Sequence, residues 1–265
     1  FLIDPEKGRV IRGDKVPVDK DNMAIDVSTF LVAYHYGFSS TIGTGAFDRR
    51  IFRQPATPMP EPKQEVLGGG SALVAPLTAL APTGTLTILD SLTYHEIVDL
   101  TNIDRVTLRS ENNTRSLIRL PAPDPDIKEW RFSGIEGSEL ILEGLFISGG
   151  DVVLQGKFDR VTLRCCTLDP GEAGIAPDPY AKAVDGRELI PCRIRVEGQI
   201  RHLTIERCIL GSIGSRGDGA IAALSITDSI VQSVGTEKAI ALNSGVVNLT
   251  RCTILGVADI HQLEA

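Results

Sequence analysis

The sequence predicts an all-β protein built as a parallel β-helix, a solenoid in which short strands stack in successive turns. Three observations lead to this prediction. A phrase of eight residues recurs with a period of about 21–23 residues. Within each copy, apolar residues alternate with polar ones, as in a strand with one buried face. Aliphatic residues and glycines are abundant, whereas aromatic residues make up only 5% of the chain.

Five copies of the phrase define the repeat, and they start 21, 42, 21 and 23 residues apart, at Leu140, Val161, Leu203, Leu224 and Val247. Positions one and three are apolar, and positions six and eight are apolar or small, so we expect a corner at positions four and five. A third apolar pair follows in most copies, which gives three short strands per turn and a three-sided solenoid. Equivalent residues should then lie above one another in the stack. The third pairs are Val152 and Leu154, Ile194 and Val196, and Ile240 and Leu242.

Position six predicts an interior column of small or apolar residues: Leu145, Cys166, Cys208, Ser229 and Cys252. Cysteine fills a small buried space well, and Leu and Ser in the same column do not suit a metal site or a redox pair. Cys165 should face away from the column. Five cysteines without paired spacing argue against a disulfide framework and favour a reducing compartment.

Residues 1–65 lack the repeat and are predicted to form an N-terminal docking and linker segment, followed by a β-helix domain over 66–265. Residues 1–17 predict a hairpin or an edge strand, and residues 24–37 predict another strand. A Pro-rich run that starts at Pro55 predicts a linker. Residues 71–80 predict a short helix that caps the stack, because the first apolar layer of a solenoid needs a cover.

Two stretches interrupt the repeat and are expected to emerge as loops. One covers 121–130 and contains the only tryptophan; the other covers 169–191 and explains the double step of 42 residues. Insertions in stacked folds often bind partners, but they can equally have no function, and both interpretations stay open. The candidate binding residues in these stretches are Trp130, Asp178, Tyr180, Asp185 and Arg187.

The net charge of −7 gives no electrostatic surface for nucleic acid or for an anionic membrane. No apolar run reaches the length of a transmembrane helix, and no signal peptide is visible. The chain begins at Phe1, and its last repeat stops soon after the second strand. We therefore expect a fragment of a longer protein, in which missing targeting signals carry little weight.

No catalytic motif is visible in the sequence. The Gly-His-Gly and Arg-x-Lys strings of polygalacturonase-like hydrolases are missing, the four histidines lack ligand spacing, and no serine lies in a nucleophile-elbow string. We therefore expect no catalytic residue, no metal site and no cofactor. Charged residues at positions four and five of the repeat are predicted to form a solvated ladder of mixed sign: Glu143, Arg164, Glu206, Arg207, Asp228 and Arg251.

The helix over 71–80 is followed by the string GTLTILDSLTYHE, which ends in a Tyr-His-Glu corner. This combination resembles the opening of right-handed β-helix proteins of the pectate-lyase-like superfamily. A second set of strings, IDPEKGR, YHYGFSSTIGTGAFDRR, VTLRCCTLDPG and LTIERCILGSI, is similar to a largely uncharacterised bacterial family. Its members are β-helix proteins associated with contractile, phage-tail-like injection systems and their baseplates. The resemblance implies a right-handed coil, for which we expect six or seven rungs.

The function expected from this resemblance is structural. The chain would be a non-enzymatic module of a contractile injection particle that presents a rigid surface to other subunits, or to a glycan or cell-surface target. Self-association into a homo-oligomer is compatible with the rod, whereas nucleic-acid binding and membrane insertion are not expected. The location would be the bacterial cytoplasm as part of a particle, with membrane association or release through the particle as alternatives. A polysaccharide lyase or hydrolase, or a glycan-binding adhesin, is the other interpretation.

Overall fold

A computed structural model of the chain describes residues 2–4, 9–11, 41–52, 58–119, 129–171 and 190–264. The chain divides into two compact units, 1–39 and 40–265, which are described separately. In the first unit, β1 (Leu2–Asp4) and β2 (Arg9–Ile11) pair antiparallel, with Leu2 opposite Ile11. The predicted hairpin is therefore confirmed. The strand predicted over 24–37 lies outside the described residues.

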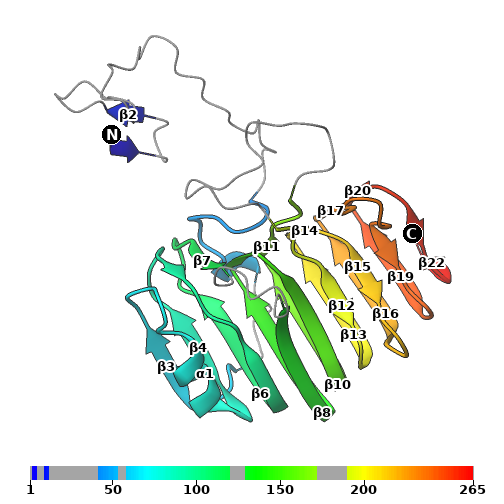
Figure 1. Cartoon of the computed structure of the whole chain (residues 1–265), viewed down its shortest axis with the longest axis horizontal. Helices are drawn as coiled ribbons and strands as arrows, with labels where there is room; N and C mark the ends of the chain where they lie inside the picture. The colour runs from blue at the N-terminus through cyan, green and yellow to red at the C-terminus, as the bar shows by residue number, and fades with distance from the viewer. Residues whose placement is uncertain are drawn as a thin grey trace, which may run out of the picture. The chain divides into compact units, whose positions relative to one another are not determined.

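The second unit is a stack of parallel strands, which Figure 1 shows side by side from β3 to β22. A large sheet of thirteen strands contains β3 (Lys63–Val66), β4 (Thr83–Ile88), β6 (Asp99–Ser110), β8 (Glu129–Glu143), β10 (Asp151–Arg164), β12 (Ile194–Val196), β13 (Gln199–Glu206), β15 (Ile213–Ser215), β16 (Ala220–Thr227), β18 (Ile240–Ala241), β19 (Val246–Thr250), β21 (Ala258–Asp259) and β22 (Gln262–Glu264). A second sheet of seven strands contains β5 (Thr93–Tyr94), β7 (Ser116–Arg119), β9 (Leu145–Ser148), β11 (Thr167–Leu168), β14 (Ile209–Leu210), β17 (Ile230–Gln232) and β20 (Thr253–Leu255).

Long strands divide the large sheet into two sides. The first half of β10 pairs with β12, and its second half pairs with β13. We call the ladder through β12, β15, β18 and β21 the first side, the ladder through β13, β16, β19 and β22 the second side, and the seven-stranded sheet the third side. The predicted all-β, parallel and solenoid-like architecture is therefore confirmed.

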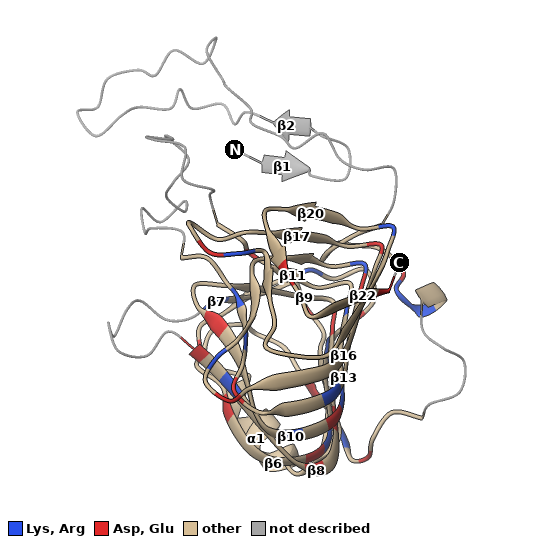
Figure 2. Cartoon of the chain, turned by 90° about the vertical axis from the view of Figure 1, so that its right-hand side faces the viewer, with Lys and Arg blue, Asp and Glu red and all other residues tan. Residues whose placement is uncertain are grey.

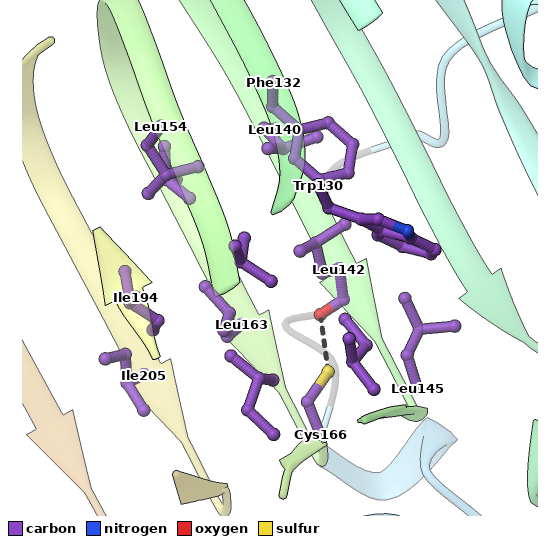
Figure 3. Packing of buried hydrophobic residues seen from close by; sticks show 14 of the residues in the cluster. Trp130, Phe132, Leu140, Leu142, Leu145, Leu154, Leu163, Cys166, Ile194 and Ile205 are labelled. Carbon is purple, nitrogen blue, oxygen red and sulfur yellow. Dashed lines mark hydrogen bonds between the residues drawn. The ribbon is translucent and has the colours of Figure 1, made fainter. Parts of the chain in front are cut away.

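The register of the second side reproduces the alignment of the sequence repeat. Leu140 pairs with Val161, Val161 with Leu203, Leu203 with Leu224, and Leu224 with Val247. All five side chains are buried. Figure 3 shows how the apolar side chains of successive strands point into one shared interior.

The predicted corner coincides with a left-handed backbone conformation. Position five of the repeat has φ between 49° and 67° in every copy, which steers the chain from the second side to the third. Glycine adopts this conformation freely, whereas other residues adopt it seldom. The recurrence of this conformation in all five copies therefore marks position five as the turn. The five residues at this position are Gly144, Cys165, Arg207, Asp228 and Arg251.

The interior column is also present. Leu145, Cys166, Cys208 and Ser229 are fully buried, whereas Cys252 in the last turn is half-buried. The Cys208 amide donates a hydrogen bond to Ser229 Oγ at 3.0 Å. Burial raises the pKa of the Cys208 thiol well above its usual value, as expected for a packed thiol.

The helix α1 (Val74–Leu80) lies within the range predicted for it and buries Leu77 and Leu80 against the first strands of the stack. Its start is fixed by Glu96, whose Oε2 accepts hydrogen bonds from the amides of Leu73 and Val74, the latter at 3.0 Å. A carboxylate at this position satisfies amides that have no partner within the helix.

The segment 41–52, which we call the strap, ends in a short 3-10 helix (Arg50–Phe52) and runs along corners of the stack. The Gly43 amide donates to the carbonyl of Arg207 at 2.7 Å, and Thr44 Oγ1 donates to the carbonyl of Leu145 at 2.7 Å. The strap and β3 thus belong to the same compact unit as the stack, which covers residues 40–265. Sequence periodicity does not reveal this, because the strap contributes contacts and no rung.

Arg49 fixes the strap to the stack. Its side chain is fully buried, and its guanidinium donates to the carbonyls of Gly45, Ser110, Glu111 and Thr114. A Cβ at Gly144 would lie 2.5 Å from Arg49 Nε, so only glycine fits there.

We expect Arg49→Ala to lower the free energy of unfolding by about 3 kcal/mol, because buried carbonyls would lose charged donors. Urea unfolding followed by circular dichroism measures this change. The matched control is Arg50→Ala, since Arg50 is exposed and its ion pair among the described residues is with the nearby Asp48 within the strap. Equal losses for the two variants would contradict the anchoring role.

Candidate functional site

The candidate binding residues from the sequence do not assemble into one site. Trp130 begins the inward face of β8 and is fully buried, and its Nε1 donates to the carbonyl of Glu96 at 2.9 Å. It packs edge-on against Phe132 in the interior, as Figure 3 shows. The expected loop position of Trp130 is therefore corrected to a core position. The other four candidates, Asp178, Tyr180, Asp185 and Arg187, lie outside the described residues.

A groove with a volume of about 740 Å³ lies on the outer face of the second side, over β6, β8, β10 and β13. Residues 58–60, which follow the strap in sequence, also line it. The Pro60 carbonyl accepts a hydrogen bond from Thr85 Oγ1 at 2.8 Å, which holds this segment against the sheet. The sequence had predicted a plain linker here.

Strand register arranges the groove into three rows, each with one residue from β6, β8, β10 and β13 in that order. Successive members of a row lie on neighbouring strands about 4.8 Å apart, and the rows are two residues apart along each strand. The first row is Arg105, Glu139, Arg160 and His202; the middle row is Thr107, Ile141, Thr162 and Thr204; the third row is Arg109, Glu143, Arg164 and Glu206.

Ion pairs run along the third row. Arg164 lies 3.6 Å from Glu143 and 2.8 Å from Glu206, measured between side-chain nitrogen and oxygen atoms. Arg109 lies 3.5 Å from Glu111 and donates to Met59 Sδ at 3.0 Å. Glu143 is only 3% exposed, so its predicted place in a solvated ladder is wrong. This part of the ladder lines the groove.

In the first row, the ion pair lies at the β6 end, between Arg105 and Glu139. Arg105 Nε lies 3.3 Å from Glu139 Oε2. Arg160 and His202, which lie on neighbouring strands and are both exposed, have no ion pair in the part of the chain that the structure describes. The groove therefore offers two nitrogen-bearing side chains that form no ion pair with any described residue.

Hydroxyl groups dominate the middle row. Thr107 is only 3% exposed, and its Oγ1 has no hydrogen-bond partner among the described residues. Native proteins seldom leave a buried hydroxyl without a partner. Such an atom in the wall of a groove is a candidate contact for a bound molecule.

The remaining part of the predicted ladder forms as expected at the corner. Asp228 lies between two arginines, at 3.2 Å from Arg207 and 2.6 Å from Arg251. The hydrogen bond from Arg251 holds the pKa of Asp228 below its usual value.

The first side has an outer network in which opposite charges neutralise one another. Arg216 lies 2.9 Å from both Glu129 and Glu197, and Arg195 lies 3.3 Å from Asp151 and 2.8 Å from Glu237. Figure 2 shows acidic and basic residues close together along the ribbons of the stack. This network leaves less unpaired charge than the first row of the groove.

Two glutamates of the groove, Glu139 and Glu143, lie too far apart to act as a catalytic pair in glycoside hydrolysis. Glu139 and Glu143 lie four residues apart on one strand, a separation of about 13 Å along β8. Paired catalytic carboxylates lie roughly 5–9.5 Å apart. Glu143 and Glu206 share Arg164 as a partner. These two carboxylates are therefore both engaged by one guanidinium.

The described ranges contain neither a metal-binding cluster nor a membrane-spanning helix. No group of three or more His, Cys, Asp and Glu side chains in these ranges could hold a metal ion. No described helix is both long and apolar enough to cross a membrane.

Comparisons with known proteins leave the chain without a match: no family model, no curated protein and no solved structure matches it. The association with contractile injection particles therefore rests on the sequence resemblance.

Sequence reasoning missed the groove, although one signal was present. Position two of the repeat is mostly Thr, Ser or Asn, and Thr162 and Thr204 of the middle row occupy it. The wall formed by residues 58–60 left no periodic signal, so the hollow itself could not be predicted.

We expect Thr107→Val to raise the free energy of unfolding by about 1 kcal/mol, because it removes a buried hydroxyl that has no partner among the described residues. Thr85→Val should lower it by about 1 kcal/mol, because Thr85 Oγ1 loses its bond to Pro60. Urea unfolding of the two variants tests the difference in sign. A loss of stability in both would show that the Thr107 hydroxyl has a partner in the folded protein.

Proposed function

We propose that the chain is a non-enzymatic binding scaffold, a rigid stack that holds an extended polar target in the groove of its second side. The observation that carries this proposal is the three-row array of polar side chains over four strands. Backbone pairing fixes the spacing of the rows, so a ligand meets a preorganised surface and pays little to order it.

We further propose that this scaffold serves a contractile, phage-tail-like injection particle, near its baseplate. The sequence resemblance supports this assignment, and it brings with it a right-handed β-helix of six or seven rungs in which α1 covers the first layer. Neighbouring subunits would contact the stack, and the groove would face a glycan or another cell-surface target. The protein would then occur in the bacterial cytoplasm within the particle, or at a membrane or outside the cell once the particle acts.

Polysaccharide cleavage is the second candidate function, favoured by three glutamates in the groove. The spacing of Glu139 and Glu143 along β8, and the pairing of all three glutamates with arginines, argue for binding instead.

The groove is tested by filling it. We expect the protein to bind members of an array of bacterial surface glycans, and Thr204→Trp to weaken that binding roughly tenfold or more, because the indole would occupy the middle row. The matched control is Thr253→Trp, which places the same side chain on the exposed outer face of β20 and should bind like the wild type. Equal binding by both variants would contradict the groove, and release of shortened glycans would show turnover.

The proposed role in a particle is tested by fractionating the lysate of the source cell. We expect the native protein to sediment with a large particle, with sheath and tube proteins identified by mass spectrometry in the same fraction. Recovery only as a small free species would contradict the structural role in a particle and leave a glycan-directed binder.

A further inference from the structure

One end of the groove contains a cluster of unopposed hydrogen-bond donors. We propose that Arg160, His202, Thr162 and Thr204 form an oxyanion-binding site, which takes a carboxylate or phosphate group of the ligand in the groove. This inference rests on the proposed binding function of the groove and names the chemistry that it recognises.

The other cations of the groove are engaged by the protein. Arg105 pairs with Glu139, Arg164 pairs with Glu143 and Glu206, and Arg109 contacts Glu111 and Met59. Arg160 and His202 have no ion pair and no side-chain hydrogen bond in the described part of the chain. The charge of Arg160 and the N–H donors of both side chains are therefore directed to solvent or to a ligand.

The register places the four donors on one small area. Arg160 pairs with His202, and Thr162 pairs with Thr204, on the neighbouring strands β10 and β13. The two pairs are about 6.6 Å apart along the strands, and the strands are about 4.8 Å apart. A guanidinium can hold a carboxylate or phosphate through two parallel hydrogen bonds. His202 supplies an N–H donor in either protonation state, and the threonine hydroxyls can donate as well.

Carboxylates near this area are held elsewhere. Glu139, the neighbour of Arg160 on β8, is bound by Arg105, and Glu206, two residues beyond Thr204, is bound by Arg164. An incoming oxyanion would thus meet carboxylates whose charge is already compensated.

The rest of the groove indicates an extended, hydroxyl-bearing ligand of low charge density. The buried Thr107 hydroxyl, which lacks a partner among the described residues, lies three strands from Thr204, about 14 Å across the sheet. A single chain molecule could contact both ends of the middle row. A densely charged nucleic acid is disfavoured, because the chain carries a net charge of −7.

The experiment titrates the protein with inorganic phosphate and, separately, with glucuronate, and follows the ring resonances of the four histidines by NMR. The His202 signal is identified by its loss in His202→Gln. We expect a saturable shift of that signal with at least one anion and none with glucose. Arg160→Gln should weaken binding of the anion roughly tenfold, because a charge-assisted bidentate contact is lost.

The matched control is Arg201→Gln. Arg201 precedes His202 on β13 and carries the same charge as Arg160, but it pairs with Asp159 and does not line the groove. It should titrate like the wild type. A response to phosphate alone assigns a phosphate-bearing ligand, and a response to glucuronate alone assigns a carboxylate-bearing one.

No saturable shift with either anion, or equal affinity in Arg160→Gln and wild type, would overturn the oxyanion site. Glycan binding that is lost in Thr204→Trp but unchanged in Arg160→Gln would overturn only this inference and leave the groove function in place. Glycan binding that survives Thr204→Trp would refute the groove function itself.

Discussion

The in-register stacking of parallel strands is the constraint on which the rest of this structure depends. Each turn completes its backbone hydrogen bonds only with the turns above and below it, so no turn is stable alone. A slip of one residue would move every inward side chain to the outer face. The pairing of Leu140, Val161, Leu203, Leu224 and Val247 shows that the apolar pattern fixes this register.

Carbonyl groups at the corners of the stack need hydrogen-bond donors, and the strap supplies them. Where the chain leaves the second side, carbonyls such as those of Ser110, Glu111 and Thr114 point away from the ladders, and Arg49 supplies them with charged donors. Burying a guanidinium is costly unless its N–H groups are satisfied. The several carbonyl acceptors of Arg49 offset that cost, which explains how a segment without apolar periodicity joins the compact unit.

The register that aligns the inward residues also aligns the outward ones, but the outer face accepts a wider choice of residue types. Inward positions hold apolar residues, or small ones such as Ser229 whose hydroxyl is hydrogen-bonded, whereas outward positions also accept charged residues. On the first side the outward charges neutralise one another through Arg195 and Arg216. In the groove, Arg160 and His202 have no ion pair among the described residues, and this difference between two faces of one sheet supports the proposal that the second side binds a ligand.

The sequence by itself determined the stacked parallel architecture, a corner at positions four and five, the column through Cys166 and Cys208, and a short helix before the first full turn. These features follow from the alternation of apolar and polar residues and from the period of the repeat, both of which can be read from the sequence alone. Only the tertiary structure decided that Trp130 lies in the core, that Glu143 is buried, and that the strap belongs to the stack. The reason is that the burial of an outer position, or of a residue after an interruption, depends on segments distant in sequence, such as Arg49 and Met59, which no periodicity reports.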